Sequence, residues 1–231
     1  MDRNLYPLRY PVLGCLLLLA VISVPFDVRL AQFFMQGHTP GELRSLIHKS
    51  EFFGHAYGIL GIAVTMYLLD ETRRRYLPRL LAAAFSAGIV CDVVKIMIPR
   101  IRPREFSFAS GESTFLGLSF LHVDSVREIY ESSSHSFPSA HTGTAVAFAM
   151  VLGCIYTKAA RWFIVLAVLV ALSRVDGCAH YLSDTCVGAV IGYVTACCYL
   201  GHGVVGQWFE RLEKRKSPLV FRLRFSDRQA A

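Results

Sequence analysis

The sequence predicts an all-α, polytopic membrane protein with six transmembrane helices in one bundle. Apolar residues make up 54% of the 231 residues and charged residues only 18%, whereas a soluble domain carries about 25% charge. The mean hydropathy is +0.43, and the apolar residues fall into long uncharged runs. This pattern excludes a disordered chain. The seven cysteines include no CxxC pair, which argues against a zinc knuckle or a disulfide-stapled secreted domain.

Six apolar runs define the predicted spans of a single domain, 1–231. They cover 10–26, 52–69, 80–98, 138–157, 162–175 and 185–205. A span needs about 20 apolar residues, within a range of about 17 to 25. The fourth and fifth runs reach this length only with polar residues included, and such residues are usually functional. The first run could instead be a signal peptide, but no small-x-small cleavage pattern follows it, so an uncleaved anchor is expected.

The distribution of Lys and Arg predicts the orientation of the bundle. With six spans, both termini lie on one side, together with the loops that follow the second and fourth spans. That side carries fifteen of the 24 basic residues: two before the first span, four and two in the loops, and seven in the tail 206–231. The positive-inside rule places it in the cytoplasm. The basic tail is therefore expected to be cytoplasmic, with no nucleic-acid partner, and the long loop 99–137 is expected outside.

Smaller features concern the loops and the helix packing. The first outer loop contains a helix-like stretch, 42–49, and the second contains a possible short helix, 124–131. Gly188 and Gly192 are four residues apart in the sixth run. Small residues at this spacing suit close packing of membrane helices.

Three polar clusters are expected to meet at the outer membrane face. They occupy 95–103 at the end of the third span, 137–142 at the start of the fourth, and 173–184 between the fifth and sixth. The 31 residues between His141 and Ser173 suffice for one helix inward, a tight turn and one helix back. The second and third clusters therefore lie on the same side of the membrane.

The residue types in these clusters predict an anion site. Lys95, Arg102 and Arg174 bring three cations together, and the arginine fork matches the oxygens of a phosphate group. The segment 138–142 opens a helix, and a helix N-terminus offers free N–H groups to an anion. Ser139 adds a hydroxyl that could donate to the anion or cap the helix. Phosphate is the most plausible occupant.

Two histidines add the chemistry of phosphoryl transfer. His180 and Asp184 are one helical turn apart, so the carboxylate can accept the imidazole N–H and leave the other ring nitrogen free to attack. His141 lies on a different span and can act as a general acid. Together these groups predict a phosphomonoester or diphosphate hydrolase with a phosphohistidine intermediate. No metal or cofactor is required, because the cations stabilise the phosphoryl charge.

Each part of this pattern also has a simpler interpretation. Lys95 and Asp92 could form a structural ion pair, and so could His180 and Asp184. The arginines within 100–104 could contact lipid headgroups. A zinc site could be built from the two histidines and Asp184, but three cations beside the metal would oppose it. The combination of all three clusters favours the anion site.

At these residues the sequence resembles the type 2 phosphatidic acid phosphatase superfamily, whose pattern is K-x6-RP, then PSGH, then SR-x5-H-x3-D. The first element matches from Lys95 to Arg102, and the third matches from 173 to 184 at full spacing. The second element matches except at Ala140, where the family has glycine. The resemblance covers about 10–205 and leaves out the basic tail.

The resemblance implies a metal-independent enzyme that acts on lipid phosphates and diphosphates. It implies His180 as nucleophile, Asp184 as the residue that orients it, and His141 as acid for the leaving group. Bacterial members face the periplasm, so a site on the periplasmic side of the inner membrane is expected. The phosphate-binding groups would be Lys95, Arg102, Ser139, Arg174 and the backbone N–H of Ala140.

Ala140 is the one departure from the family pattern. Glycine is required only where the backbone has positive φ or approaches a ligand closely. We expect a helical conformation with negative φ at this position, which tolerates the methyl group, and therefore an active enzyme.

Three functions compete at this point. The leading one is a membrane lipid phosphatase, with phosphatidic acid, phosphatidylglycerol phosphate, undecaprenyl diphosphate and lipid A phosphates as candidate substrates. The first alternative is a phosphotransferase that uses the same phosphohistidine with a lipid acceptor. The second is a non-catalytic lipid-phosphate binder or transporter, which would not need a paired nucleophile such as His180. The sequence does not choose among the lipids, because the apolar walls of the spans contact lipid tails without specificity.

Overall fold

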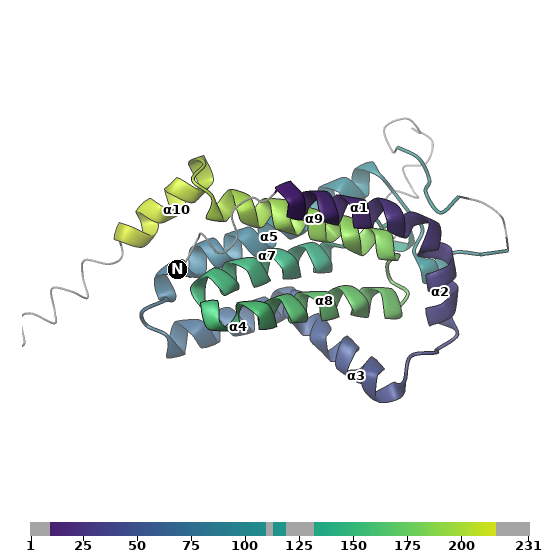
Figure 1. Ribbon diagram of the computed structural model, residues 1–231, viewed down its shortest axis with the longest axis horizontal. Coiled ribbons are helices and arrows are strands. Elements are labelled where there is room, and N and C mark those ends of the chain that lie inside the picture. Colours follow the sequence, from purple (N-terminus) through teal and green to yellow (C-terminus); the bar gives the residue numbers. More distant parts are fainter. Residues whose placement is uncertain (1–9, 110–112, 119–131, 216–231) are drawn as a thin grey trace, which may run out of the picture.

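The computed structural model describes residues 10–109, 113–118 and 132–215, and these residues form a bundle of helices (Figure 1). The α-helices are α1 Tyr10–Ser23, α2 Asp27–Met35, α3 Gly41–Ser50, α4 Ala56–Leu69, α5 Leu77–Met97, α7 Ala140–Ile155, α8 Ala160–Asp176, α9 Leu182–Leu200 and α10 Val204–Arg215. The described residues form no β-strand, only isolated bridges of Arg100 with Phe115 and His135. The predicted all-α class is confirmed.

Three helical segments are long and apolar enough to cross a membrane. They are Tyr10–Met35, Arg74–Met97 and Leu182–Leu200. A fourth results if Gly41–Gly54 and Ala56–Leu69, which are bent by 69° at a short break, count as one span. α7 and α8 have only 16 and 17 residues. The structure therefore supports a membrane protein with three to four such segments, and the count of six spans stays a prediction.

α7 forms the centre of the bundle, packed against α5, α8 and α9 (Figure 1). Its residues are apolar or small on all sides, and a helix with this composition is stable where other helices surround it. Phe148 and the alanines beside it are fully buried. Because other helices surround α7, it can be part of the bundle with only 16 residues. It also places the N-terminus of α7 between the ends of three neighbours.

Glycines set the contact between α7 and α9. A Cβ atom on Gly188 would lie 2.4 Å from the Ser139 carbonyl oxygen, and one on Gly192 would lie 2.3 Å from the Gly143 carbonyl oxygen. Both separations are too short for a methyl group, so the two backbones touch only because side chains are absent. The small-residue spacing in the sixth run therefore does mark close helix packing, as predicted.

Gly192→Ala is expected to destabilise the protein by about 1–3 kcal/mol, because the new methyl group must push α7 and α9 apart. Thermal unfolding in detergent would measure this as a lower Tm. Gly14→Ala is the matched control, since a Cβ atom there has no neighbour within 4 Å. Equal Tm values for the two variants would contradict the proposed contact.

The segment expected as a basic tail, 206–231, begins with an ordered helix. Arg79 in α5 is fully buried and donates from Nε to Glu213 in α10 at 2.6 Å, and from Nη1 to the Tyr199 carbonyl at 2.7 Å. This ion pair attaches α10 to the bundle. This ion pair was not predicted from the sequence, because only the net charge of the tail was considered.

Two short helices were predicted in the loops, and the structure tests one of them. The helix-like stretch 42–49 is confirmed as part of α3. The possible short helix at 124–131 lies outside the described residues.

Candidate active site

The three predicted clusters lie at one end of the bundle, at the right in Figure 1. The C-terminal ends of α5 and α8 and the N-terminal ends of α7 and α9 meet there. Lys95 lies in the last turn of α5, and Arg174 in the last turn of α8. Ser139 is the N-cap of α7, and Asp184 lies in the first turn of α9. The fold thus gathers residues that are far apart in sequence.

His180 is held in one tautomer by the backbone. Its side chain is 3% exposed, and Nδ1 lies 2.5 Å from the carbonyl oxygen of Ser136. A carbonyl only accepts, so Nδ1 carries the proton and Nε2 keeps a free lone pair. Burial, followed by the charges of Arg174, Lys95 and Arg102, lowers the pKa of His180 well below its usual value. Both effects favour the neutral form of the imidazole.

Asp184 does not accept the His180 N–H, contrary to the expected direct hydrogen bond. Its Oδ2 lies 3.9 Å from His180 Nδ1 and instead accepts from Ser136 Oγ at 2.6 Å and from the Tyr181 N–H at 2.8 Å. The i, i+4 spacing brings the two side chains near each other, but the Ser136 carbonyl is placed closer to the ring. Asp184 therefore acts on His180 through Ser136, whose hydroxyl it holds.

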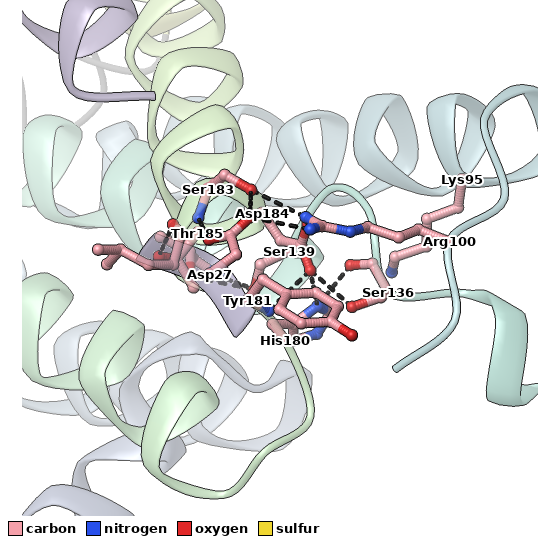
Figure 2. A network of polar contacts seen from close by, with 12 residues as sticks. Asp27, Lys95, Arg100, Ser136, Ser139, His180, Tyr181, Ser183, Asp184 and Thr185 are labelled. Carbon is pink, nitrogen blue, oxygen red and sulfur yellow. Dashed lines mark hydrogen bonds and ion pairs between the residues drawn. The ribbon is translucent and has the colours of Figure 1, made fainter. Parts of the chain in front are cut away.

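Arg100 is the centre of the buried polar network shown in Figure 2. Its Nη1 donates to Asp184 Oδ1 at 2.5 Å and to Ser183 Oγ at 2.8 Å, and its guanidinium carbon lies 3.8 Å from the centre of the Tyr181 ring. The Arg100 carbonyl also accepts the Ser136 N–H at 3.0 Å. The side chain is 2% exposed, so the suggestion that it contacts lipid headgroups is wrong for this residue.

Asp27, at the start of α2, completes this network. Its Oδ2 lies 2.8 Å from Arg100 Nη2 and also accepts from Ser183 Oγ, while Oδ1 accepts the Ser183 N–H at 2.9 Å. Asp27 is 1% exposed. A single arginine therefore links the N-terminal helices to the first turn of α9, and it forms ion pairs with two buried carboxylates.

The three predicted cations are less completely paired than Arg100. Lys95 Nζ donates to Asp92 Oδ1 at 2.8 Å, so the alternative of an ion pair at this position is confirmed, and Arg174 Nη1 donates to Glu51. The Nε atoms of both Arg102 and Arg174 are buried and have no hydrogen-bond partner among the described residues. Burial, followed by the charges of Arg104 and Arg174, lowers the pKa of Arg102. A bound anion would give the two free Nε donors a partner.

Glu51 is an acidic residue at this site that sequence reasoning missed. It begins the 3-10 segment Glu51–Gly54. Its Oε1 accepts from Arg174 Nη1 and lies 3.8 Å from His141 Nε2. A signal was available in the sequence, because Glu51 directly precedes the second apolar run.

The N-terminus of α7 carries the remaining predicted residues. Ser139 is fully buried and caps the helix, with its Oγ accepting from the Thr142 N–H at 3.5 Å and from Thr142 Oγ1 at 3.1 Å. His141 follows, with its side chain 29% exposed. Ala140 is the first helical residue. Cys178 is the single non-glycine residue with positive φ among those described, so Ala140 has the expected negative φ.

Ala140→Gly is expected to change kcat/KM for phosphate release by no more than about twofold. The alanine methyl lies on a helical backbone, and glycine at a helix end costs well under about 1 kcal/mol. Steady-state kinetics on the same lipid would measure the effect. A variant without activity would show that the methyl group itself shapes the site.

The described residues contain no group of three His, Cys, Asp or Glu side chains placed to hold a metal ion. His141 and His180 come instead beside arginines. Arg174 and Arg102 are among the charges that act on the His180 ring. The donor set thus suits an anion better than a cation.

Comparison with known proteins agrees with this architecture. Decaprenylphosphoryl-5-phosphoribose phosphatase of Mycobacterium tuberculosis is 29% identical over 153 residues, which cover 66% of this chain and 76% of that protein. The crystal structure of Aquifex aeolicus LpxE shares the fold, with a TM-score of 0.53 and 18% identity over 76% of this chain and 94% of that one. The PAP2 superfamily pattern matches residues 76–205. Since this match spans more than half of the sequence, the chain belongs to the PAP2 superfamily.

Proposed function

We propose that this protein is an integral-membrane phosphatase that removes phosphate from a lipid phosphate through a phosphohistidine on His180. The observation that carries the proposal is the state of this residue: a buried, neutral imidazole whose Nδ1 is fixed and whose surroundings hold three cations. Membership of the PAP2 superfamily and the phosphatase activity named for the M. tuberculosis relative support it. That relative's name also points to a lipid phosphate as substrate.

In the first step, Nε2 of His180 attacks the phosphorus atom and the ester P–O bond breaks as the P–N bond forms. Arg102 and Arg174 would hold the phosphoryl oxygens with the Nε donors that have no other described partner. Lys95 and the Ala140 N–H would add to this binding, with the N-cap Ser139 beside them. His141 would donate a proton to the departing oxygen. The product is a free alcohol on the lipid.

In the second step, water attacks the phosphohistidine. His141, now neutral, accepts a proton from the water while the P–N bond breaks and inorganic phosphate leaves. Asp184 and Arg100 would act as positioning residues throughout, since they hold Ser136 and with it the His180 ring. No step requires a metal ion, because the cations neutralise the charge of the phosphoryl group.

We also propose six spans, with both termini in the cytoplasm and the site at the outer face of a bacterial inner membrane. The short helices α7 and α8 support this arrangement, because each runs the depth of the bundle between the site and the opposite end (Figure 1). The described basic residues that precede α5 and α8 lie at the end of the bundle away from the site, which supports a cytoplasmic position for that end under the positive-inside rule.

Phosphate release by the purified protein in detergent with EDTA tests the function directly. The substrates would be phosphatidic acid, phosphatidylglycerol phosphate, undecaprenyl diphosphate and a lipid A phosphate. Release that persists in EDTA and is inhibited by vanadate, which mimics the transferred phosphoryl group, supports the proposal. Release that EDTA abolishes would contradict the metal-free mechanism. Release that depends on an added lipid alcohol would identify a phosphotransferase.

A further inference from the structure

A cavity of about 430 Å³ lies beside His141, lined by residues of α5, of α7 and of the segment that begins α4. This volume falls within the range of about 300–1,000 Å³ typical of small-molecule sites. Most of the wall is apolar, with Phe85 and Ile89 from α5 and Ala140 from α7. The ionisable residues that line it are His55, Asp92 and His141.

The position of this cavity relates it to the leaving group. Under the proposed function, His141 protonates the oxygen that leaves the phosphorus atom, and His141 lines the cavity. The part of the substrate attached to that oxygen must therefore occupy the space next to His141. The cavity thus receives the leaving group, while the phosphate lies with the cations and His180.

His55 presents an unused polar atom beside this cavity. Its Nδ1 is buried and has no hydrogen-bond partner among the residues described. The centre of its ring lies 5.2 Å from that of the His141 ring and 3.9 Å from that of the Tyr57 ring, to which it is tilted by 33°. Gly54 makes this placement possible, since a Cβ atom there would lie 2.7 Å from the His141 carbonyl oxygen. A buried donor or acceptor without a partner is costly, so a ligand that completes it gains affinity.

Asp92, in α5, is a second polar residue that lines the cavity. Its Oδ1 accepts from Lys95 Nζ at 2.8 Å, yet its side chain remains 64% exposed, whereas that of Lys95 is only 13% exposed. The carboxylate therefore retains capacity to accept from a hydroxyl group in the cavity. A histidine and a carboxylate facing one space are suited to binding an alcohol.

We propose that the natural leaving group carries free hydroxyl groups, so that the substrate is a phosphomonoester of a lipid-linked glycerol or sugar. His55 and Asp92 would bind those hydroxyls, and the apolar walls would contact the carbon skeleton and the chain beyond. A phosphate attached directly to a hydrocarbon or to an acylated glycerol would bring no free hydroxyl group to these two side chains, because the other oxygens of an acylated glycerol are esterified. This inference rests on the proposed function and narrows its substrate class.

The test compares two lipids that differ in the leaving group. Phosphatidylglycerol phosphate has a free hydroxyl on the glycerol that departs, whereas phosphatidic acid departs as diacylglycerol with none. The variants are His55→Phe, which keeps the aromatic ring against Tyr57, and Asp92→Asn, which keeps an oxygen for Lys95. His202→Gln, in the exposed turn between α9 and α10, is the matched histidine control. The quantity measured is the ratio of kcat/KM for the two lipids.

Wild type and the His202 variant are expected to favour the hydroxylated lipid by at least about tenfold, and each cavity variant is expected to lower that ratio about three- to tenfold. Phosphate release that depends on His180 but shows no such preference would overturn this inference and leave the proposed function standing. Equal losses on both lipids would also overturn it, because His55 and Asp92 would then act on His141 and Lys95. No release from either lipid by wild type would overturn the proposed function and this inference together.

Discussion

His180→Ala will release no measurable phosphate from any lipid, with a fall in kcat of at least about 10⁴-fold. The variant loses the atom that bonds to phosphorus, and the remaining cations can only bind the substrate. KM should change little, because Arg102 and Arg174 still offer their free Nε donors. Steady-state assays of inorganic phosphate would give both constants. Unfolding temperatures would show that the variant is folded, with His202→Gln as the control.

A second measurement separates the covalent mechanism from direct attack by water. With a lipid labelled in its phosphate, wild type stopped in mid-turnover should carry label that survives alkali and is lost in acid, as a P–N bond requires. The His180 variant should carry none. Activity above about 1% of wild type in that variant would exclude His180 as the nucleophile and shift attention to His141 on α7.

The sequence predicted which helices are present better than it predicted where each helix begins and ends. Long apolar runs identify α1, α5 and α9, because these helices have many exposed apolar side chains, as helices that cross a membrane require. α7 is different, since protein surrounds it and its length is set by its neighbours rather than by the bilayer. The α2 and α3 helices were not separated from a loop, except for the stretch 42–49. Their mixed composition gives no apolar run.

For the site, too, the sequence predicted contacts that follow from local spacing but not contacts between distant segments. The motif spacing predicted that His141, His180 and Arg174 come together, because helix geometry fixes the ends of adjacent spans. The spacing did not show that Ser136, rather than Asp184, holds the His180 ring. An i, i+4 pair is compatible with a hydrogen bond but does not require one, and the competing carbonyl comes from another segment.

Arg100 illustrates why such contacts escape a single sequence. Three arginines alternate at 100, 102 and 104, and alternation in an extended segment sends neighbours at odd and even positions in opposite directions. Residues two apart should therefore share an environment, yet Arg100 is buried and Arg104 is exposed. The 3-10 turn Pro103–Glu105 ends the alternation before Arg104, and Arg100 has a buried partner in Asp27, which lies 73 positions away in the sequence. Such a partner is found only when the fold is known.

Arg100→Met is expected to destabilise the protein by about 3–5 kcal/mol, because it leaves Asp27 and Asp184 buried without their cation. A double variant that also replaces Asp27 tests whether the buried, unpaired charge causes this loss of stability. Asp27→Asn combined with Arg100→Met removes one of the two unpaired charges, so the double variant should recover part of the lost Tm. If the double variant is less stable than Arg100→Met alone, the burial of an unpaired charge is not the reason for the loss.

Kinetics of the milder Arg100→Lys variant then distinguish positioning from substrate binding. Lysine keeps the charge but cannot donate in a fork to Asp184 and Asp27 at once, so Ser136 and the His180 ring should lose their alignment. We expect kcat to fall at least about tenfold while KM stays within about twofold, since Arg100 is 2% exposed and its Nη atoms already donate to Asp184 and Asp27. A raised KM with an unchanged kcat would mean that Arg100 binds the headgroup directly. A lower kcat with an unchanged KM is the result expected of a residue that affects only the orientation of the nucleophile.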